Sequence, residues 1–141
     1  MGKNKFDISF KSNIYIVSDI VADSLDFLRE SYPKLNQDSL MEFRLIYCEL
    51  LFNAVIHGNN SDERKSVFLS INAKGDFVSS VVSDEGIGFD YKKTIKAGGD
   101  DENLFLETGR GIRLVKSLVD SLDFDVNGST VKFCKRVEFD G

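Results

Sequence analysis

Alternation of hydrophobic and polar residues is the first pattern in the chain. It runs over residues 6–11, with an apolar side chain at every second position, and predicts a half-buried β-strand. The same pattern, with turn residues between segments, predicts further strands over 66–73, 77–83, near 124 and over 131–137. Lys74-Gly75-Asp76 and Asn127-Gly128 supply two hairpin turns between them.

Helical periodicity fills most of the remaining chain. Ser18 can cap a first helix from about 19 to 31. A second helix is expected from 38 or 39 to about 57, and a third from about 111 to 122. The core-facing side chains of the second helix are predicted to be Leu40, Phe43, Ile46, Tyr47, Leu50 and Val55.

These elements predict a single domain over 1–141. Each helix and each strand has one apolar face, and two packed layers are enough to bury them. The expected fold is therefore an α/β arrangement of the α+β type: a two-layer sandwich whose mixed, mostly antiparallel sheet has helices on one face. The 141 residues suffice for one hydrophobic core.

Charge and composition narrow the class of protein. A net charge of -5 argues against nucleic-acid binding, which needs a basic stripe. No apolar run approaches the roughly 20 residues that cross a bilayer. Cys48 and Cys134 lack metal-ligand spacing, so buried, reduced thiols are expected. We expect a cytoplasmic protein that contacts neither nucleic acid nor membrane.

A first candidate motif lies at the end of the second predicted helix. Glu49, Asn53 and His57 are spaced four residues apart and share one stripe of that helix. An amide oxygen suits Mg²⁺, and a carboxylate one turn away can take a proton from a hydroxyl. The alternative is a solvated polar edge, and His57 is expected to cap or pack rather than react.

A second motif, Asp84-Glu85-Gly86-Ile87-Gly88, directly follows a predicted strand. A carboxylate at a strand end can accept a hydrogen bond from an exocyclic amine such as adenine N6, and glycines let the backbone approach a flat ring. The alternative is an ordinary surface turn.

The third motif, Gly109-Arg110-Gly111, opens the third predicted helix. Free N–H groups at a helix start bind phosphate, and an arginine adds positive charge. A flexible hinge is the alternative. The order and spacing of all three motifs favour an ATP site.

Together the motifs resemble the N, G1 and G2 boxes of the GHKL ATPase superfamily, which has the Bergerat ATP-binding fold. The resemblance covers roughly residues 6–138. The sequences of residues 84–90 and 109–112 are most similar to the same motifs of the RsbW-like anti-sigma factor serine/threonine kinases, although Ile112 stands where leucine is common.

The resemblance implies that ATP and Mg²⁺ bind, under a lid over about 91–108. Glu49 would be the catalytic base, Asn53 the magnesium ligand and Asp84 the adenine-reading carboxylate. The full set of nucleotide-binding residues would be Asn53, Asp84, Gly86, Gly88, Gly109, Arg110 and Gly111.

It also implies a homodimeric protein serine/threonine kinase that phosphorylates a STAS-domain anti-anti-sigma factor and, in its other state, sequesters a sigma factor. The alternative is a nucleotide-sensing binding module without catalysis. A two-component histidine kinase is disfavoured because His57 lies inside the ATP motif itself.

Overall fold

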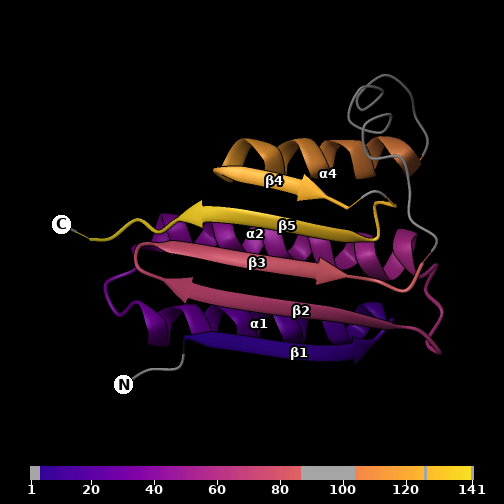
Figure 1. The fold of residues 1–141 in the computed structure, drawn as a ribbon, viewed down its shortest axis with the longest axis horizontal. Helices are drawn as coiled ribbons and strands as arrows, with labels where there is room; N and C mark the ends of the chain where they lie inside the picture. Colours follow the sequence, from indigo (N-terminus) through magenta and orange to yellow (C-terminus); the bar gives the residue numbers. More distant parts are fainter. Residues whose placement is uncertain (1–3, 87–103, 126, 141) are drawn as a thin grey trace.

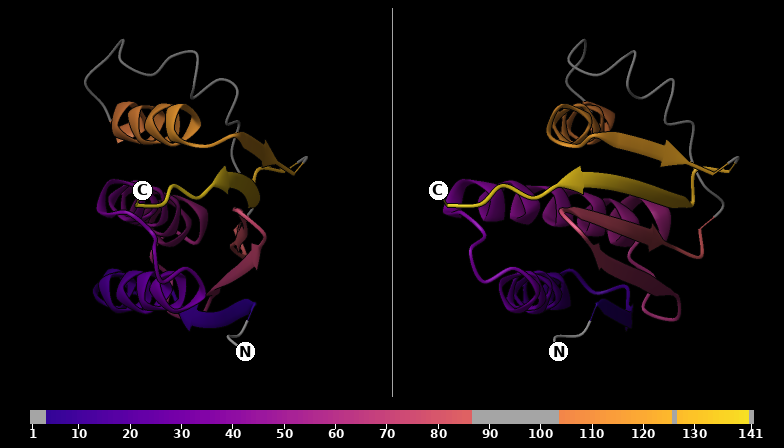
Figure 2. Two further views of the ribbon diagram at one scale, coloured as in Figure 1. Left: turned by 90° about the vertical axis from the view of Figure 1, so that its left-hand side faces the viewer. Right: turned by 60° about the vertical axis from the view of Figure 1, so that its left-hand side comes forward.

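The structure, a computed structural model, describes residues 4–86, 104–125 and 127–140, with the backbone alone for 104–110. In these residues, five strands form one sheet in the order β1-β2-β3-β5-β4, and the helices cover one of its faces (Figures 1 and 2). The elements are β1 (Lys5–Lys11), α1 (Ile14–Ser31), α2 (Gln37–Asn53), the π-helical turn η1 (Ala54–Gly58), β2 (Ser66–Lys74), β3 (Phe77–Ser83), α4 (Leu104–Leu118), β4 (Ser121–Phe124) and β5 (Thr130–Arg136).

The predicted α+β sandwich is confirmed, with one difference in the sheet. Every strand pairing in the described part of the chain is antiparallel, where the sequence predicts a mixed sheet. Alternation turns one side of each strand toward the helices, so that Val67, Leu69 and Ile71 of β2 are fully buried. The opposite side of β2 carries exposed residues such as Phe68 and Asn72.

The central helix α2 supplies much of the core. All six of its predicted core residues are buried, from Leu40 to Val55 at the start of η1. Tyr47 is fully buried, and its hydroxyl lies 2.7 Å from the Ser80 hydroxyl on β3. Burial raises the pKa of Tyr47, so this pair joins helix to sheet as a neutral hydrogen bond.

The start of α1 differs from the prediction of a Ser18 cap. Asn13 is the N-cap, and its side-chain oxygen accepts a hydrogen bond from the Tyr15 N–H at 2.9 Å. Asparagine and serine cap helices about equally well, so local sequence does not choose between them. The longer helix also buries Val17 completely, which favours the earlier start.

The predicted start of the third helix is wrong. α4 begins at Leu104 and ends at Leu118, whereas 111 to 122 was the predicted range. Gly109, Arg110 and Gly111 therefore lie inside a helix rather than in a turn ahead of it. Glycine destabilises a helix interior by about 1 kcal/mol relative to alanine, and the stabilisation from tertiary packing can outweigh this cost.

The two cysteines are free thiols, as predicted, but both are half-buried rather than buried. Among the described helices, none is long and apolar enough to cross a membrane.

Candidate functional site

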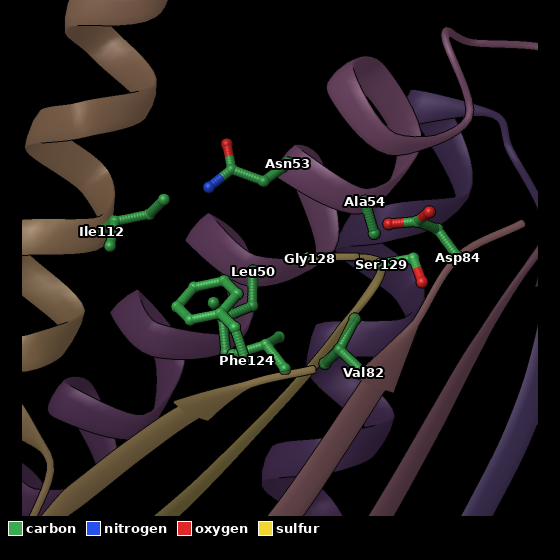
Figure 3. A pocket seen from close by; sticks show the side chains of 10 residues that line it. Leu50, Asn53, Ala54, Val82, Asp84, Ile112, Phe124, Gly128 and Ser129 are labelled. Atoms are coloured by element: carbon green, nitrogen blue, oxygen red, sulfur yellow. The ribbon is translucent and has the colours of Figure 1, made fainter. Parts of the chain in front are cut away.

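A pocket lies between α2, α4 and the ends of β3, β4 and β5 (Figure 3). The space between its walls is about 330 Å³ when the open solvent at its mouth is included. Its lining residues are Leu50, Asn53, Ala54, Val82, Asp84, Ile112, Phe124, Gly128, Ser129 and Val131. Two polar side chains of the predicted motifs thus meet in one largely apolar hollow.

Asp84 is placed by the end of β3. Its backbone N–H donates to the Ser129 carbonyl at 2.9 Å, which extends the pairing of β3 with β5 by one step. Its carboxylate accepts a hydrogen bond from the Gly86 N–H at 2.8 Å. Burial raises the pKa of the Asp84 carboxyl, and the Gly86 hydrogen bond partly opposes this. The second oxygen can accept from a ligand amine.

Gly58 and Gly86 are glycines because their neighbours leave no room for a side chain. A Cβ at Gly58 would overlap the Asp84 carboxylate, and a Cβ at Gly86 would overlap the Gly58 carbonyl oxygen. The sequence predicts that the glycines after Asp84 let the backbone approach a flat ring. In this structure the group that the backbone at Gly86 approaches is the end of η1.

Asn53 is the last residue of α2, and its amide extends toward the helix that carries Ile112 (Figure 3). Its side-chain nitrogen is buried and has no hydrogen-bond partner among the described residues. Buried polar side-chain atoms normally have a hydrogen-bond partner, so this nitrogen can donate to a polar group that enters the pocket. Donation by this amide to a phosphate oxygen would satisfy it.

Glu49 lies one turn before Asn53, half-buried, where α4 packs on α2. A Cβ at Gly111 would overlap the Glu49 carboxylate. The structure thus brings two predicted site residues from distant motifs together. It does not continue the stripe to His57, because η1 is a π-helical turn and the His57 side chain is exposed.

Other predicted site residues are only partly described. Gly88 and residues 91–103 of the predicted lid lie outside the described residues, while 104–108 form the start of α4. Gly109 and Arg110 belong to the same helix. Free N–H groups are confined to the first four residues of a helix, so in this structure they are not at 109–111.

Several pocket residues carry no motif signal. Phe124 and Ser129 reach the pocket through the β4–β5 hairpin, where the Asp125 carboxylate accepts a hydrogen bond from the Ser129 N–H at 2.9 Å. Gly128 adopts a φ of 77°, which favours glycine. The sequence marks Asn127-Gly128 as a turn, but not as a pocket wall.

Fold and pocket define a class: an α+β sandwich with a pocket between its central helix and the strand β3, which Asp84 directly follows. Comparison with known proteins then identifies the family. The model of the histidine kinase-like ATPase domain matches residues 20–135, and the chain belongs to this family. Membership implies ATP binding and confirms the resemblance to the GHKL superfamily.

Curated relatives point in the same direction. The chain is 28% identical over 102 residues to the anti-sigma F factor of Geobacillus thermodenitrificans, covering 70% of each chain. It is 22% identical over 139 residues to that of Bacillus subtilis, covering 96% of this chain and 94% of the relative. The chain is thus similar to anti-sigma factors over almost its whole length.

Proposed function

We propose that the chain is an ATP-dependent protein serine/threonine kinase that phosphorylates a STAS-domain anti-anti-sigma factor and otherwise sequesters a sigma factor. The observation that carries the proposal is the pairing of Glu49 and Asn53 one turn apart on α2. Asn53 offers an unsatisfied buried amide for the phosphates. A binding module would need no carboxylate at position 49, whereas phosphoryl transfer needs a proton acceptor.

In the proposed reaction, the partner's hydroxyl oxygen bonds to the γ-phosphorus and the bond from that phosphorus to the β–γ bridging oxygen breaks. ADP leaves with that bridging oxygen, and the hydroxyl proton passes to the Glu49 carboxylate. Asp84 would hold the adenine amine, at the far side of the pocket from Asn53 (Figure 3). The two ends of the nucleotide would then be fixed by separate elements, β3 and α2.

The side chains at the pocket suit a magnesium ion that is bound jointly by the protein and the phosphates of a nucleotide. No group of three carboxylate, histidine or cysteine side chains suited to a metal occurs in the described part of the chain. Mg²⁺ commonly takes one or two protein oxygens and completes its shell with phosphates and water. The Asn53 carbonyl oxygen would be that protein ligand, and the ion would offset charge on the phosphates.

The remaining assignments follow the family pattern. Gly86 and Gly88 would flank the adenine, and Gly109, Arg110 and Gly111 would bind the phosphates. Because 109–111 lie inside α4, phosphate binding there requires this part of α4 to change its backbone when ATP enters. A homodimer in the cytoplasm is the proposed working form.

The decisive experiment is transfer of labelled γ-phosphate to purified STAS-domain proteins encoded by the same genome. Glu49→Gln should bind ATP within about threefold of the wild type yet lose transfer by about 100-fold or more. Glu30→Gln, the same change at an exposed position of α1, is the control and should transfer normally. Transfer by Glu49→Gln at the control's rate would refute the assigned role.

One observation favours a second candidate, a nucleotide-sensing module without catalysis. Gly111 of α4 fills the space beside the Glu49 carboxylate, where a partner hydroxyl would have to arrive. If α4 keeps this position with ATP bound, the carboxylate is covered and the protein only reports nucleotide state. Tight ATP binding with no phosphate on any STAS partner would select this candidate.

A further inference from the structure

Asn59 is a fully buried polar residue that none of the proposed roles uses. It directly follows η1, and its backbone N–H donates to the Ala54 carbonyl at 2.9 Å, which closes the π-helical turn. The next two residues, Asn60 and Ser61, both have a φ of 55°. Non-glycine residues rarely adopt this conformation, so the chain reverses sharply just after Asn59.

The Asn59 side chain joins three separate segments. Its nitrogen donates to the Ser12 hydroxyl, just after β1, at 2.6 Å and to the Ser66 carbonyl, at the start of β2, at 2.8 Å. Its oxygen accepts the Glu85 N–H at 2.7 Å, just beyond β3. Both nitrogen hydrogens and the carbonyl oxygen are therefore engaged, as burial requires.

The hydrogen bond to Glu85 is the one that bears on the pocket. Glu85 directly follows Asp84, so the bond ties the backbone beside the adenine-reading carboxylate to the end of η1. The Glu85 side chain reinforces the same corner by accepting from the Ser66 N–H. Gly58 and Gly86 allow the two backbones to meet there without side chains between them.

We propose that Asn59 is a positioning residue for the Asp84 carboxylate, and through it a determinant of adenine selectivity. The inference rests on the proposed adenine-reading role of Asp84. Asn59 does not contact the nucleotide. It fixes the position of the end of β3 relative to α2, and therefore the position of the Asp84 carboxylate relative to the adenine. A displacement of about 1 Å can cost a factor of 100 in a positioned interaction.

The test compares binding of ATP and of inosine triphosphate, which carries an oxygen in place of the exocyclic amine. The wild type should prefer ATP by about tenfold or more, since a site built for a hydrogen-bond donor rejects an analogue without it. Asn59→Ala should weaken ATP binding by about tenfold and bring the preference to within about threefold of unity.

Ser12→Ala is the matched control. It removes one acceptor of the Asn59 nitrogen and the hydrogen bond from Ser12 to the Lys65 carbonyl at 2.9 Å, but leaves the bond to Glu85. It should lower the thermal midpoint as Asn59→Ala does, with the nucleotide preference of the wild type. An equal loss of preference in both variants would mean a purely structural role and overturn the proposal.

Failure of the inference and of the proposed function are distinguishable. A wild-type chain that binds both nucleotides equally overturns the role of Asp84 and the inference together. A preference present in the wild type and intact in folded Asn59→Ala overturns the inference alone. Should Asn59→Ala not fold, amide hydrogen exchange on the wild type decides: the Glu85 amide should be protected, and exchange at the rate of a free peptide would refute the bond.

Discussion

The Glu49 carboxylate on α2 lies directly against Gly111 on α4, so closely that the smallest side chain at position 111 would overlap it. The two residues belong to different motifs and lie more than 60 positions apart in the sequence. Their contact makes the position of α4 a determinant of what the carboxylate can reach. The absence of a side chain at 111 therefore serves the site, although it weakens the helix.

Gly111→Ala should displace the Glu49 carboxylate and lower phosphate transfer by about 10- to 100-fold. Alanine gains about 1 kcal/mol of helix stability over glycine, and the overlap offsets that gain. In a Glu49→Ala background the overlap is gone, so the same change should raise the free energy of unfolding by about 1 kcal/mol.

Urea unfolding of the four proteins in this double-mutant cycle measures the coupling between the two sites. A gain of equal size in both backgrounds would show that Gly111 and Glu49 do not interact.

Asn53→Ala should affect stability and binding in opposite directions. It removes a buried amide nitrogen that has no partner in the described part of the chain and introduces a better helix former. We expect the free energy of unfolding to rise by about 1 kcal/mol. Calorimetry in Mg²⁺ and in EDTA should show weaker ATP binding without magnesium dependence. Retained magnesium dependence would contradict the ligand assignment.

Asp84→Asn, like Asn53→Ala, should raise the stability of the fold and weaken ATP binding. Burial raises the Asp84 pKa above its ordinary value of 3.8, so the folded chain holds this proton more tightly than the unfolded chain. Stability then falls as pH rises through the interval between the two pKa values. This destabilisation is fully present above the folded-state pKa of Asp84 and vanishes below the unfolded-state pKa.

The thermal midpoint of Asp84→Asn should thus exceed that of the wild type at pH 7, and the difference should shrink by about pH 3. The variant should also lose about tenfold or more in ATP affinity, with weakened adenine selectivity. Unchanged ATP binding would remove Asp84 from the adenine site.

The helical and strand periods predict most elements because burial of one face dominates their energetics. The core face that α2 and η1 share, from Leu40 to Val55, follows directly from the apolar spacing. The start of α4 does not, because glycine is unfavourable inside a helix, and Gly109 and Gly111 therefore argue locally for a helix that begins after them. The packing of α4 against α2 is a tertiary interaction, so the helix propensities of the local sequence cannot predict it.

Some residues of the candidate site can be predicted from the local sequence, and others cannot. Asn53 and Asp84 carry signals in their own neighbourhoods, a helical stripe and a strand end followed by glycine. Phe124 joins the site through the pairing of β4 with β5, and Ser129 and Asn59 join it through hydrogen bonds to residues far away in the chain. A sequence pattern shows that such residues are apolar or polar, but not what they will meet.

Lys135 on β5 is a further long-range link, and it leads to the last prediction. Its side chain is almost fully buried, and its ammonium donates to the Leu118 carbonyl at 2.7 Å and lies 2.9 Å from the Glu42 carboxylate. It thereby joins the C-terminal end of α4 to α2 and the sheet. Lys135→Met should lower the free energy of unfolding by about 1–3 kcal/mol, because the Leu118 carbonyl loses its partner.

Lys132→Met is the matched control, since Lys132 lies on the same strand but is exposed. It should change stability by less than about 0.5 kcal/mol. Because Lys135 holds the C-terminal end of α4 at Leu118, its loss should also loosen the contact of Gly111 with Glu49 and lower phosphate transfer. Urea unfolding and labelled-phosphate transfer measure the two effects. A Lys135→Met protein that is destabilised but transfers phosphate at the control's rate would show that α4 is held at Glu49 by its own packing.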